Sequence, residues 1–476
     1  MAINIVENCQ IAPSSRAPAE QLLKLLHFDM LWLLSSPLKI LVFYDLSCSE
    51  SYFLDTVVPN LKNSLSLSLK HFPSLAGKIL IPYNSRPVSR YVGGEDSVSM
   101  TISVSNADFK KAIGYHSREA DEVHGLVSPP DSSTIKLLAI QVTLFPNQGV
   151  CIGLTGHHST CDGPALTLFM KAWASINKFN GDESRLFASG EECLPFYNRD
   201  VVPDGDQLAD ECWSHVKMLM PTITATTAID TLHPMVTTRQ RTFHATIVLL
   251  SEAEMKILKS FVLHKKPDMV RVSSFSVACA HLWTCFVKAA AAAGEEVADD
   301  EPEYISFLVD CRGRFRPPLP NNYFGNCMLT VVTESTNGTL RGNKGLLSAA
   351  EVIGEAIRKT IDNERGIMDG YTKSVLEFVK RRGERMLIVG GSPRLDFYGI
   401  DYGWGGPIKY EAVSDRDSLE VFFLSKSRKY RGGMEIGVLM SKVRMDAFAA
   451  VFDRAKRKKV YGAKCKTGQS LGVRKK

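Results

Sequence analysis

The sequence has no long uninterrupted apolar segment. Its most apolar stretch, 22–44, is broken by Lys24, Asp29, Pro37 and other polar residues, so it does not predict a membrane span. The first twenty residues also lack the basic region followed by an apolar run that marks a secretory signal peptide. We therefore expect a cytoplasmic protein without a membrane partner.

The sequence also lacks a Cys-x-x-Cys pair, and its 11 cysteines show no repeated spacing. This pattern predicts neither a structural zinc site nor a disulfide framework. Cys151, Cys279 and Cys285 stand inside apolar runs, which indicates buried free thiols in a reducing compartment. We expect no bound metal.

The body of the chain lacks an excess of positive charge. The formal charge is +6, but 454–476 holds ten Lys or Arg and no acidic residue, and without these ten the chain has 47 basic and 51 acidic residues. A nucleic-acid-binding protein is expected to carry its basic patch on the fold, so we expect no nucleic-acid partner. We interpret 456–476 as a solvated basic tail rather than a localisation or membrane-surface signal.

With 476 residues, the chain is longer than one hydrophobic core usually serves, which predicts two domains. The composition, 45% hydrophobic and 23% charged, is that of a globular protein. Helix and strand patterns alternate, which predicts the α/β or α+β class. Because the pattern weakens after about residue 180, we expect domains at 1–195 and 226–455, joined by a linker at 196–225.

A predicted strand-to-helix loop lies near the middle of the first domain. Residues 135–145 are largely β-formers, 146–149 form a turn by composition, and 150–155 are apolar again. A helix pattern then starts near Pro164 and continues through Trp173. In the second domain we expect a helix over 275–292 capped by Ser273 or Ser274, a strand at 304–310 and one long helix around 349–379.

His158, Asp162 and Gly163 lie on that loop. An imidazole can take a proton near neutral pH, so His158 is a candidate general base that activates a hydroxyl. Asp162 can hold the loop, and Gly163 permits a tight backbone path. Polar residues with a structural role in a turn would give the same pattern. A metal site of His157, His158 and Asp162 is disfavoured, because adjacent histidines point in different directions and no further ligand cluster is evident.

A second cluster occupies 401–407, where Asp401, Gly403, Trp404 and Gly405 stand close together. Glycines around an indole suit a loop whose backbone closely approaches another group. A packed turn with the indole as a core plug explains the same residues.

Together, the His-x-x-x-Asp-Gly segment and the Asp-Tyr-Gly-Trp-Gly segment about 240 residues later resemble the BAHD acyltransferase family of plants. The match continues through 71–78, 310–314 and 317–320 and covers the chain to about residue 455. The resemblance implies two similar domains, each related to chloramphenicol acetyltransferase, with an active-site channel at their interface.

By the same resemblance, His158 is the base in the channel and Asp162 points away from it to pair with an arginine. Asp401 is architectural, with Arg312 as its expected partner. The tetrahedral intermediate needs a hydrogen-bond donor at its oxyanion, for which we consider the Trp404 N–H or a backbone amide. No acyl-enzyme is required, so Cys161 is not expected to act as a nucleophile.

Acyl-CoA is the expected co-substrate, and no resident cofactor is implied. Its phosphates call for cations and amides, which Lys265, Lys266 and a helix start at Ser273 and Ser274 could supply. An exposed basic loop and an ordinary helix cap explain these four residues equally well.

The stretch 322–327 resembles the branch that acylates glucosides of flavonoids, anthocyanins and other phenolics. Residues 173–179, Asp182, Glu183 and 195–199 resemble its malonyl-transferring members. We therefore favour malonyl-CoA as donor over a hydroxycinnamoyl-CoA, whose acceptor would be an anthocyanin glucoside or another alcohol or amine. The alternatives are a carrier-protein-dependent relative such as a condensation domain, and a small-molecule binding protein on the same scaffold. We expect a monomer.

Overall fold

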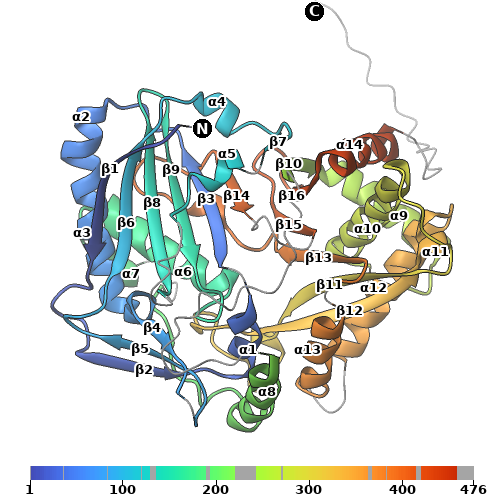
Figure 1. The fold of residues 1–476 in the computed structure, drawn as a ribbon, viewed down its shortest axis with the longest axis horizontal. Helices are drawn as coiled ribbons and strands as arrows, with labels where there is room; N and C mark the ends of the chain where they lie inside the picture. The colour runs from blue at the N-terminus through green and yellow to red at the C-terminus, as the bar shows by residue number, and fades with distance from the viewer. Residues whose placement is uncertain are drawn as a thin grey trace, which may run out of the picture.

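The fold was analysed in a computed structural model, which describes residues 2–457 except 36, 83, 120, 129–135, 189–192, 220–242, 270–271, 363–366, 382 and 414–419. Two large mixed sheets with helices packed against them form two lobes, one from each half of the chain (Figure 1). The class is therefore α/β, as the alternating patterns predict.

The first lobe is built on a six-stranded sheet. Its strands run in the order β1 (Asn4–Ile11), β6 (Val98–Val104), β8 (Leu138–Phe145), β9 (Gly149–Gly156), β3 (Leu38–Tyr44) and β14 (Lys409–Val413). A small sheet beside it has the order β2 (Glu20–Lys24), β5 (Val88–Val92) and β4 (Lys78–Leu80). The antiparallel pairing of β8 with β9 confirms the predicted hairpin, whose strands are almost wholly buried.

Helices cover both faces of this sheet. On β3, Ile40 and Val42 point to one face of the sheet and pack in a core with the helices at 58–71 and 163–178. Leu41 and Phe43 point to the other face and pack in a second core with Phe109. The helical segments are α1 (His27–Met30), η1 (Leu31–Leu34), α2 (Glu50–Tyr52), η2 (Phe53–Val57), α3 (Val58–His71), η3 (Pro73–Ala76), α4 (Phe109–Ala112), α5 (Asp121–His124), α6 (Gly163–Lys178), α7 (Arg185–Ala188) and α8 (Gly205–Leu219).

The second lobe is built on a seven-stranded sheet. Its order is β12 (Met328–Thr336), β11 (Pro302–Asp310), β13 (Met386–Gly391), β15 (Val421–Lys426), β16 (Met434–Ser441), β10 (Phe243–Leu250) and β7 (Arg118–Glu119). Its helical segments are α9 (Glu252–Lys265), α10 (Ser274–Ala292), η5 (Arg312–Arg314), α11 (Asn337–Arg341), α12 (Gly345–Ile361), α13 (Tyr371–Lys380), η6 (Phe397–Gly399) and α14 (Lys442–Arg457).

Helix α10 is the centre of the second core. It begins where Ser273 accepts a hydrogen bond from the N–H of Ser276, so the predicted cap is confirmed. In the described part of the chain, α10 is also the one helix long and apolar enough to cross a membrane, but 78% of its 18-residue apolar stretch is buried inside the protein. Its apolar composition therefore matches its position in the core.

The expected linker 196–225 contains α8, whose buried Ala209, Cys212, Trp213 and Val216 form a helical stripe at intervals of three and four residues. Its role as a linker stays a prediction. One prediction about a helix needs correction. The single helix expected around 349–379 is two helices, α12 and α13. Gly370 lies directly before α13 with φ 76°, a left-handed conformation that interrupts a helix. Most of the tail 456–476 lies outside the described residues.

Each large sheet contains one strand from the other half of the chain. β14 pairs with β3 in the first sheet, and β7 pairs with β10 in the second (Figure 1). Arg118 on β7 and Glu411 on β14 form a buried ion pair, and Lys409 contacts the same carboxylate at 2.9 Å. Burial would raise the pKa of Glu411, but Lys409 and Arg118 lower it. These charges therefore tie the exchanged strands together.

Glu411→Gln is expected to lower the free energy of unfolding by about 3 kcal/mol or more, because it leaves two buried cations without their shared carboxylate. The control is Asp446→Asn, which removes the exposed partner of Lys442 and should cost less than about 0.5 kcal/mol. Urea unfolding followed by circular dichroism measures both. Equally small losses in the two variants would contradict a role for the buried pair.

Candidate active site

The loop 157–162 connects the end of β9 to the start of α6. Asp162 is the N-cap of α6, and its Oδ1 accepts a hydrogen bond from the N–H of Ala165 at 3.1 Å. Gly163 and Pro164 form the first turn, where proline is favoured because its nitrogen has no hydrogen to satisfy. The predicted strand-to-helix position of His158 and Asp162 is therefore confirmed.

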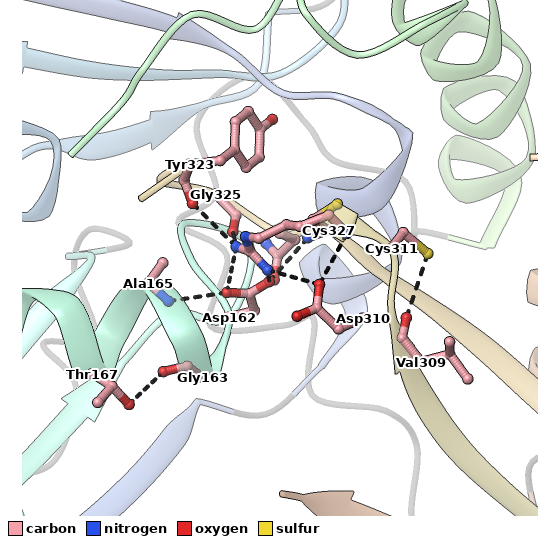
Figure 2. Close-up of polar contacts among 12 residues, drawn as sticks. Asp162, Gly163, Ala165, Thr167, Val309, Asp310, Cys311, Tyr323, Gly325 and Cys327 are labelled. Carbon is pink, nitrogen blue, oxygen red and sulfur yellow. Dashed lines mark hydrogen bonds and ion pairs between the residues drawn. The ribbon is translucent and has the colours of Figure 1, made fainter. Parts of the chain in front are cut away.

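The Asp162 side chain is held by Arg312, which comes from η5 in the second half of the chain. Arg312 Nη1 donates to Oδ2 at 2.8 Å and Nη2 donates to Oδ1 at 2.9 Å, a bidentate pair. The N–H of Cys327 adds a bond to Oδ2 at 3.0 Å (Figure 2). The expected arginine partner of Asp162 is therefore present, while the expected pairing of Arg312 with Asp401 is wrong.

Arg312 also fixes the backbone of the segment 323–325. Its Nη2 donates to the carbonyl oxygens of Tyr323 at 3.1 Å and Gly325 at 3.0 Å. Arg312 and Asp162 are only 3% and 1% exposed. A buried charge pair of this kind depends on both partners, because either charge alone is costly to desolvate.

His158 is half-buried, and its ring stacks on the indole of Trp32 with a centroid distance of 3.8 Å and an interplanar angle of 10°. Its backbone oxygen accepts a hydrogen bond from Asn326 Nδ2 at 2.9 Å. Burial lowers the pKa of His158 below 6.5, although the Asp162 carboxylate opposes the shift. The ring is therefore neutral near pH 7, as a general base must be.

Asn326 links this loop to α1. Its Nδ2 also donates to Asp29 Oδ1 at 2.9 Å, while Asp29 Oδ2 accepts from the N–H of Leu26 at 2.8 Å. Asp29 is fully buried, and burial raises its pKa. Sequence reasoning missed Trp32, Asp29 and Asn326 as parts of the site. The one signal in the sequence was Asp29, an acidic residue inside the apolar segment 22–44.

The neighbouring polar residues have their own partners. His157 Nδ1 shares a hydrogen bond of 2.6 Å with Ser159 Oγ, and burial lowers the pKa of His157 to about 4. Burial raises the pKa of the Cys161 thiol, which keeps it protonated. Among the described residues, no group of His, Cys, Asp and Glu side chains is placed to hold a metal ion.

Asp401 organises the second motif at the C-terminal end of α6. Its Oδ1 accepts hydrogen bonds from the N–H groups of Gly403 and Gly405, both at 2.8 Å, and its Oδ2 accepts one from Lys178 Nζ at 2.7 Å. Gly403 and Gly405 have φ of 100° and 84°, which suits glycine. Burial would raise the pKa of Asp401, but Lys178 and the two amides lower it.

Trp404 packs far from His158. Its ring contacts Tyr44 and Tyr402, and Tyr402 in turn packs against Trp173 in the second half of α6. The 16 residues of α6 span about 24 Å, and His158 precedes the opposite end. The interpretation of Trp404 as the oxyanion donor is therefore corrected: its contacts make it a support for the core, which leaves a backbone amide as the candidate.

Comparison with known proteins identifies the family. Residues 1–454 match the model of the Transferase family. Phenolic glucoside malonyltransferase 1 of Nicotiana tabacum is 40% identical over 94% of this chain and 98% of its own length. An anthocyanin 3-O-glucoside malonyltransferase of Dahlia pinnata is 35% identical over 95% and 97%. The chain belongs to the BAHD acyltransferases of the Transferase family.

Solved structures show the same fold. Vinorine synthase superimposes with a TM-score of 0.67 at 19% identity, covering 94% of this chain and 96% of its own. TRI101 of F. sporotrichioides, in complex with coenzyme A and T-2, gives a TM-score of 0.67 at 16% identity, covering 91% and 98%. These likenesses confirm the two-domain BAHD architecture.

In this BAHD chain, the four residues proposed for CoA lie around the C-terminus of α9 and the N-terminus of α10. Lys265 ends α9, and the Nζ of the next residue, Lys266, lies 3.0 Å from Glu351 Oε1. Ser273 and Ser274 are exposed at the start of α10. The helix N-terminus and the two cations suit an anion, and binding of CoA there stays a prediction.

Asp162→Asn is expected to lower the free energy of unfolding by about 3–5 kcal/mol and to reduce acyl transfer with it, because the amide leaves the buried Arg312 charge with only the half-exposed Asp310 as counterion. The control is Asp310→Asn, which alters the half-exposed second partner of Arg312 at 3.3 Å and should cost less than about 1 kcal/mol. Thermal and urea unfolding, run beside the transfer assay, test this. A stable, inactive Asp162→Asn variant would instead indicate a direct catalytic role.

Proposed function

We propose that this enzyme transfers a malonyl group from malonyl-CoA to a hydroxyl of a phenolic or flavonoid glucoside. The observation that carries the proposal is a neutral, half-buried imidazole at His158 in a chain 40% identical to a phenolic glucoside malonyltransferase. Relatives named as malonyltransferases of anthocyanin 3-O- and 5-O-glucosides, each 35% identical, support the same donor and acceptor class.

In the proposed reaction, the acceptor oxygen attacks the thioester carbonyl while His158 takes the hydroxyl proton. A positioned base contributes about a hundred- to ten-thousand-fold to such a step. The tetrahedral oxyanion then collapses and breaks the C–S bond. The leaving thiolate of CoA, whose conjugate thiol titrates near roughly 8.5, takes the proton back from the imidazolium. The products are the acylated glucoside and free CoA.

A hydroxycinnamoyl donor is the second candidate. Coumaroyltransferases of anthocyanidin 3-O-glucosides from Arabidopsis thaliana are 30% and 29% identical to this chain, below the malonyltransferases. A non-catalytic binding protein on the same scaffold is a weaker candidate, because both motifs keep their acidic and glycine residues.

We also propose a cytoplasmic monomer that acts on small molecules without a nucleic-acid or membrane partner. A single chain supplies the site from both halves, since Arg312 and Asn326 hold the loop that carries His158. The burial of α10 and the confinement of the basic excess to the tail support the absence of membrane and nucleic-acid partners.

Purified protein incubated with equal amounts of malonyl-CoA, coumaroyl-CoA and a set of phenolic glucosides is expected to give malonylated products, identified by mass spectrometry. His158→Ala should lower the rate by at least about a hundredfold while CoA binding stays nearly intact. His157→Asn is the adjacent control and should lose no more than about tenfold. A coumaroylated product would identify the second donor, and an equally active His158→Ala variant would exclude this base.

The pH profile of kcat/KM is expected to have an acid limb with its midpoint below 6.5, because burial lowers the pKa of His158 and only the neutral ring accepts a proton. The unfolded chain binds this proton more readily, so acidification through the same range also lowers stability. Circular dichroism at each pH separates the two effects. A midpoint above 6.5 in the folded enzyme contradicts the assignment.

A further inference from the structure

The imidazole of His158 has an indole against its face. Trp32, on η1, stacks on it with a centroid distance of 3.8 Å and an interplanar angle of 10°. The two rings come from segments more than a hundred residues apart in the sequence. No motif in the sequence marks Trp32 as part of the site.

In the described part of this site, no carboxylate orients the histidine base. Such a base normally has one ring nitrogen bonded to a carboxylate or carbonyl, which fixes the ring and stabilises the imidazolium. Here Nδ1 of His158 is buried and has no partner at full hydrogen-bond geometry among the described residues, although the backbone of His158 itself and the Asn326 side chain raise the pKa of the ring. The motif carboxylate, Asp162, is engaged by Arg312, Cys327 and Ala165 instead.

We propose that Trp32 is a positioning residue of this site, whose indole holds the His158 ring in place and stabilises the imidazolium formed when the ring takes the acceptor's proton. The inference rests on the proposed role of His158 as base. It goes beyond that role, because it assigns an orienting function to an aromatic face that lies outside both motifs.

The physical basis is the attraction of a cation to an aromatic face. Trp is the strongest of the aromatic partners, and the attraction acts within about 6 Å of the ring centroid. The observed centroid distance of 3.8 Å lies well inside this limit. The neutral imidazole gains little from it, so the indole favours the charged form. That form exists only after proton transfer, and an interaction that strengthens then lowers the barrier.

Trp32 stands on a fixed segment. Asp29, just before it, bonds to the N–H of Leu26 and to Asn326, and the hydroxyl of Tyr371 donates to the backbone oxygen of His27 at 3.0 Å. His27, Phe28 and Met30 are fully buried. The indole is therefore presented to the ring by packed neighbours, as a positioning group requires.

The charged and titratable groups near His158 can be separated from the effect of Trp32 on its pKa. Asp162, at the start of α6, raises the pKa of His158 but is paired with Arg312. Asp29, on α1, is buried beside Asn326, and His157 on the same loop has a pKa of about 4 and is neutral near pH 7. A change confined to Trp32 leaves each of these groups in place.

The test compares Trp32→Leu with Trp32→Phe. Leucine keeps apolar atoms over the ring but has no aromatic face, whereas phenylalanine keeps a smaller one. With malonyl-CoA and a phenolic glucoside, Trp32→Leu is expected to lower kcat about tenfold or more and to leave KM for malonyl-CoA within about twofold. Trp32→Phe should recover most of the loss. In a His158→Ala background, Trp32→Leu should cause no further loss, because the two residues act as one unit.

A second readout needs no turnover. The pKa of His158 is measured by NMR on protein labelled at histidine Cε1, with the resonance assigned by its absence in His158→Ala. Trp32→Leu is expected to lower this pKa by about 0.5 to 1.5 units, and Trp32→Phe by less. An unchanged or raised pKa in Trp32→Leu, or a Trp32→Phe variant as slow as Trp32→Leu, overturns the proposal.

The two readouts separate this inference from the proposed function. If the wild-type protein transfers no acyl group while the NMR shift is present, the function fails and the coupling of the two rings stands. If transfer depends on His158 but neither kcat nor the pKa responds to Trp32→Leu, the function stands and the role of Trp32 is wrong.

Discussion

The bidentate pair between Asp162 and Arg312 is the interaction on which the site depends. It joins the N-terminus of the helix behind the active-site loop to a turn in the other half of the chain, and both partners are almost fully buried. Because neither charge can be left alone at such burial, the two halves have one stable relative arrangement at this point. The carbonyls of Tyr323 and Gly325, bound to the same guanidinium, place Asn326 beside the backbone of His158.

This use of the aspartate changes how the motif is understood. In a His-x-x-x-Asp-Gly segment, the acid and the base are four residues apart, which invites a catalytic dyad. The structure instead gives the carboxylate a cap, an arginine and a backbone amide as partners. The histidine is held by contacts from elsewhere: Asn326 on its backbone oxygen and Trp32 on its ring. Architecture and chemistry in the motif are therefore assigned to different residues.

Local features of the site could be predicted from sequence, and long-range pairings could not. The β8–β9 hairpin, the start of α6 and the loop position of His158 follow from turn composition, apolar runs and a proline in a first helical turn. Which carboxylate Arg312 meets depends on how distant segments fold together, and there the prediction chose Asp401 wrongly. Helix α8 was predictable from its stripe of Ala209, Cys212, Trp213 and Val216, but proline and polar neighbours obscured the pattern. Trp32 carries no local signal, since its role exists only across a tertiary contact.

The second motif, 401–405, acts on helix α6, the helix that Arg312 holds at its other end. Helix α6 is held at its first turn by Arg312 and at its last turn by the Asp401 segment, where Lys178 bonds to Asp401 and Asn177 Nδ2 donates to the backbone oxygen of Tyr402 at 2.7 Å. Both anchors come from the second half of the chain. A helix fixed at one end could still pivot and carry the loop of His158 with it, whereas one fixed at both ends about 24 Å apart cannot. The two distant motifs thus act on one rigid element, and the segment 401–405 supports it from the end opposite His158.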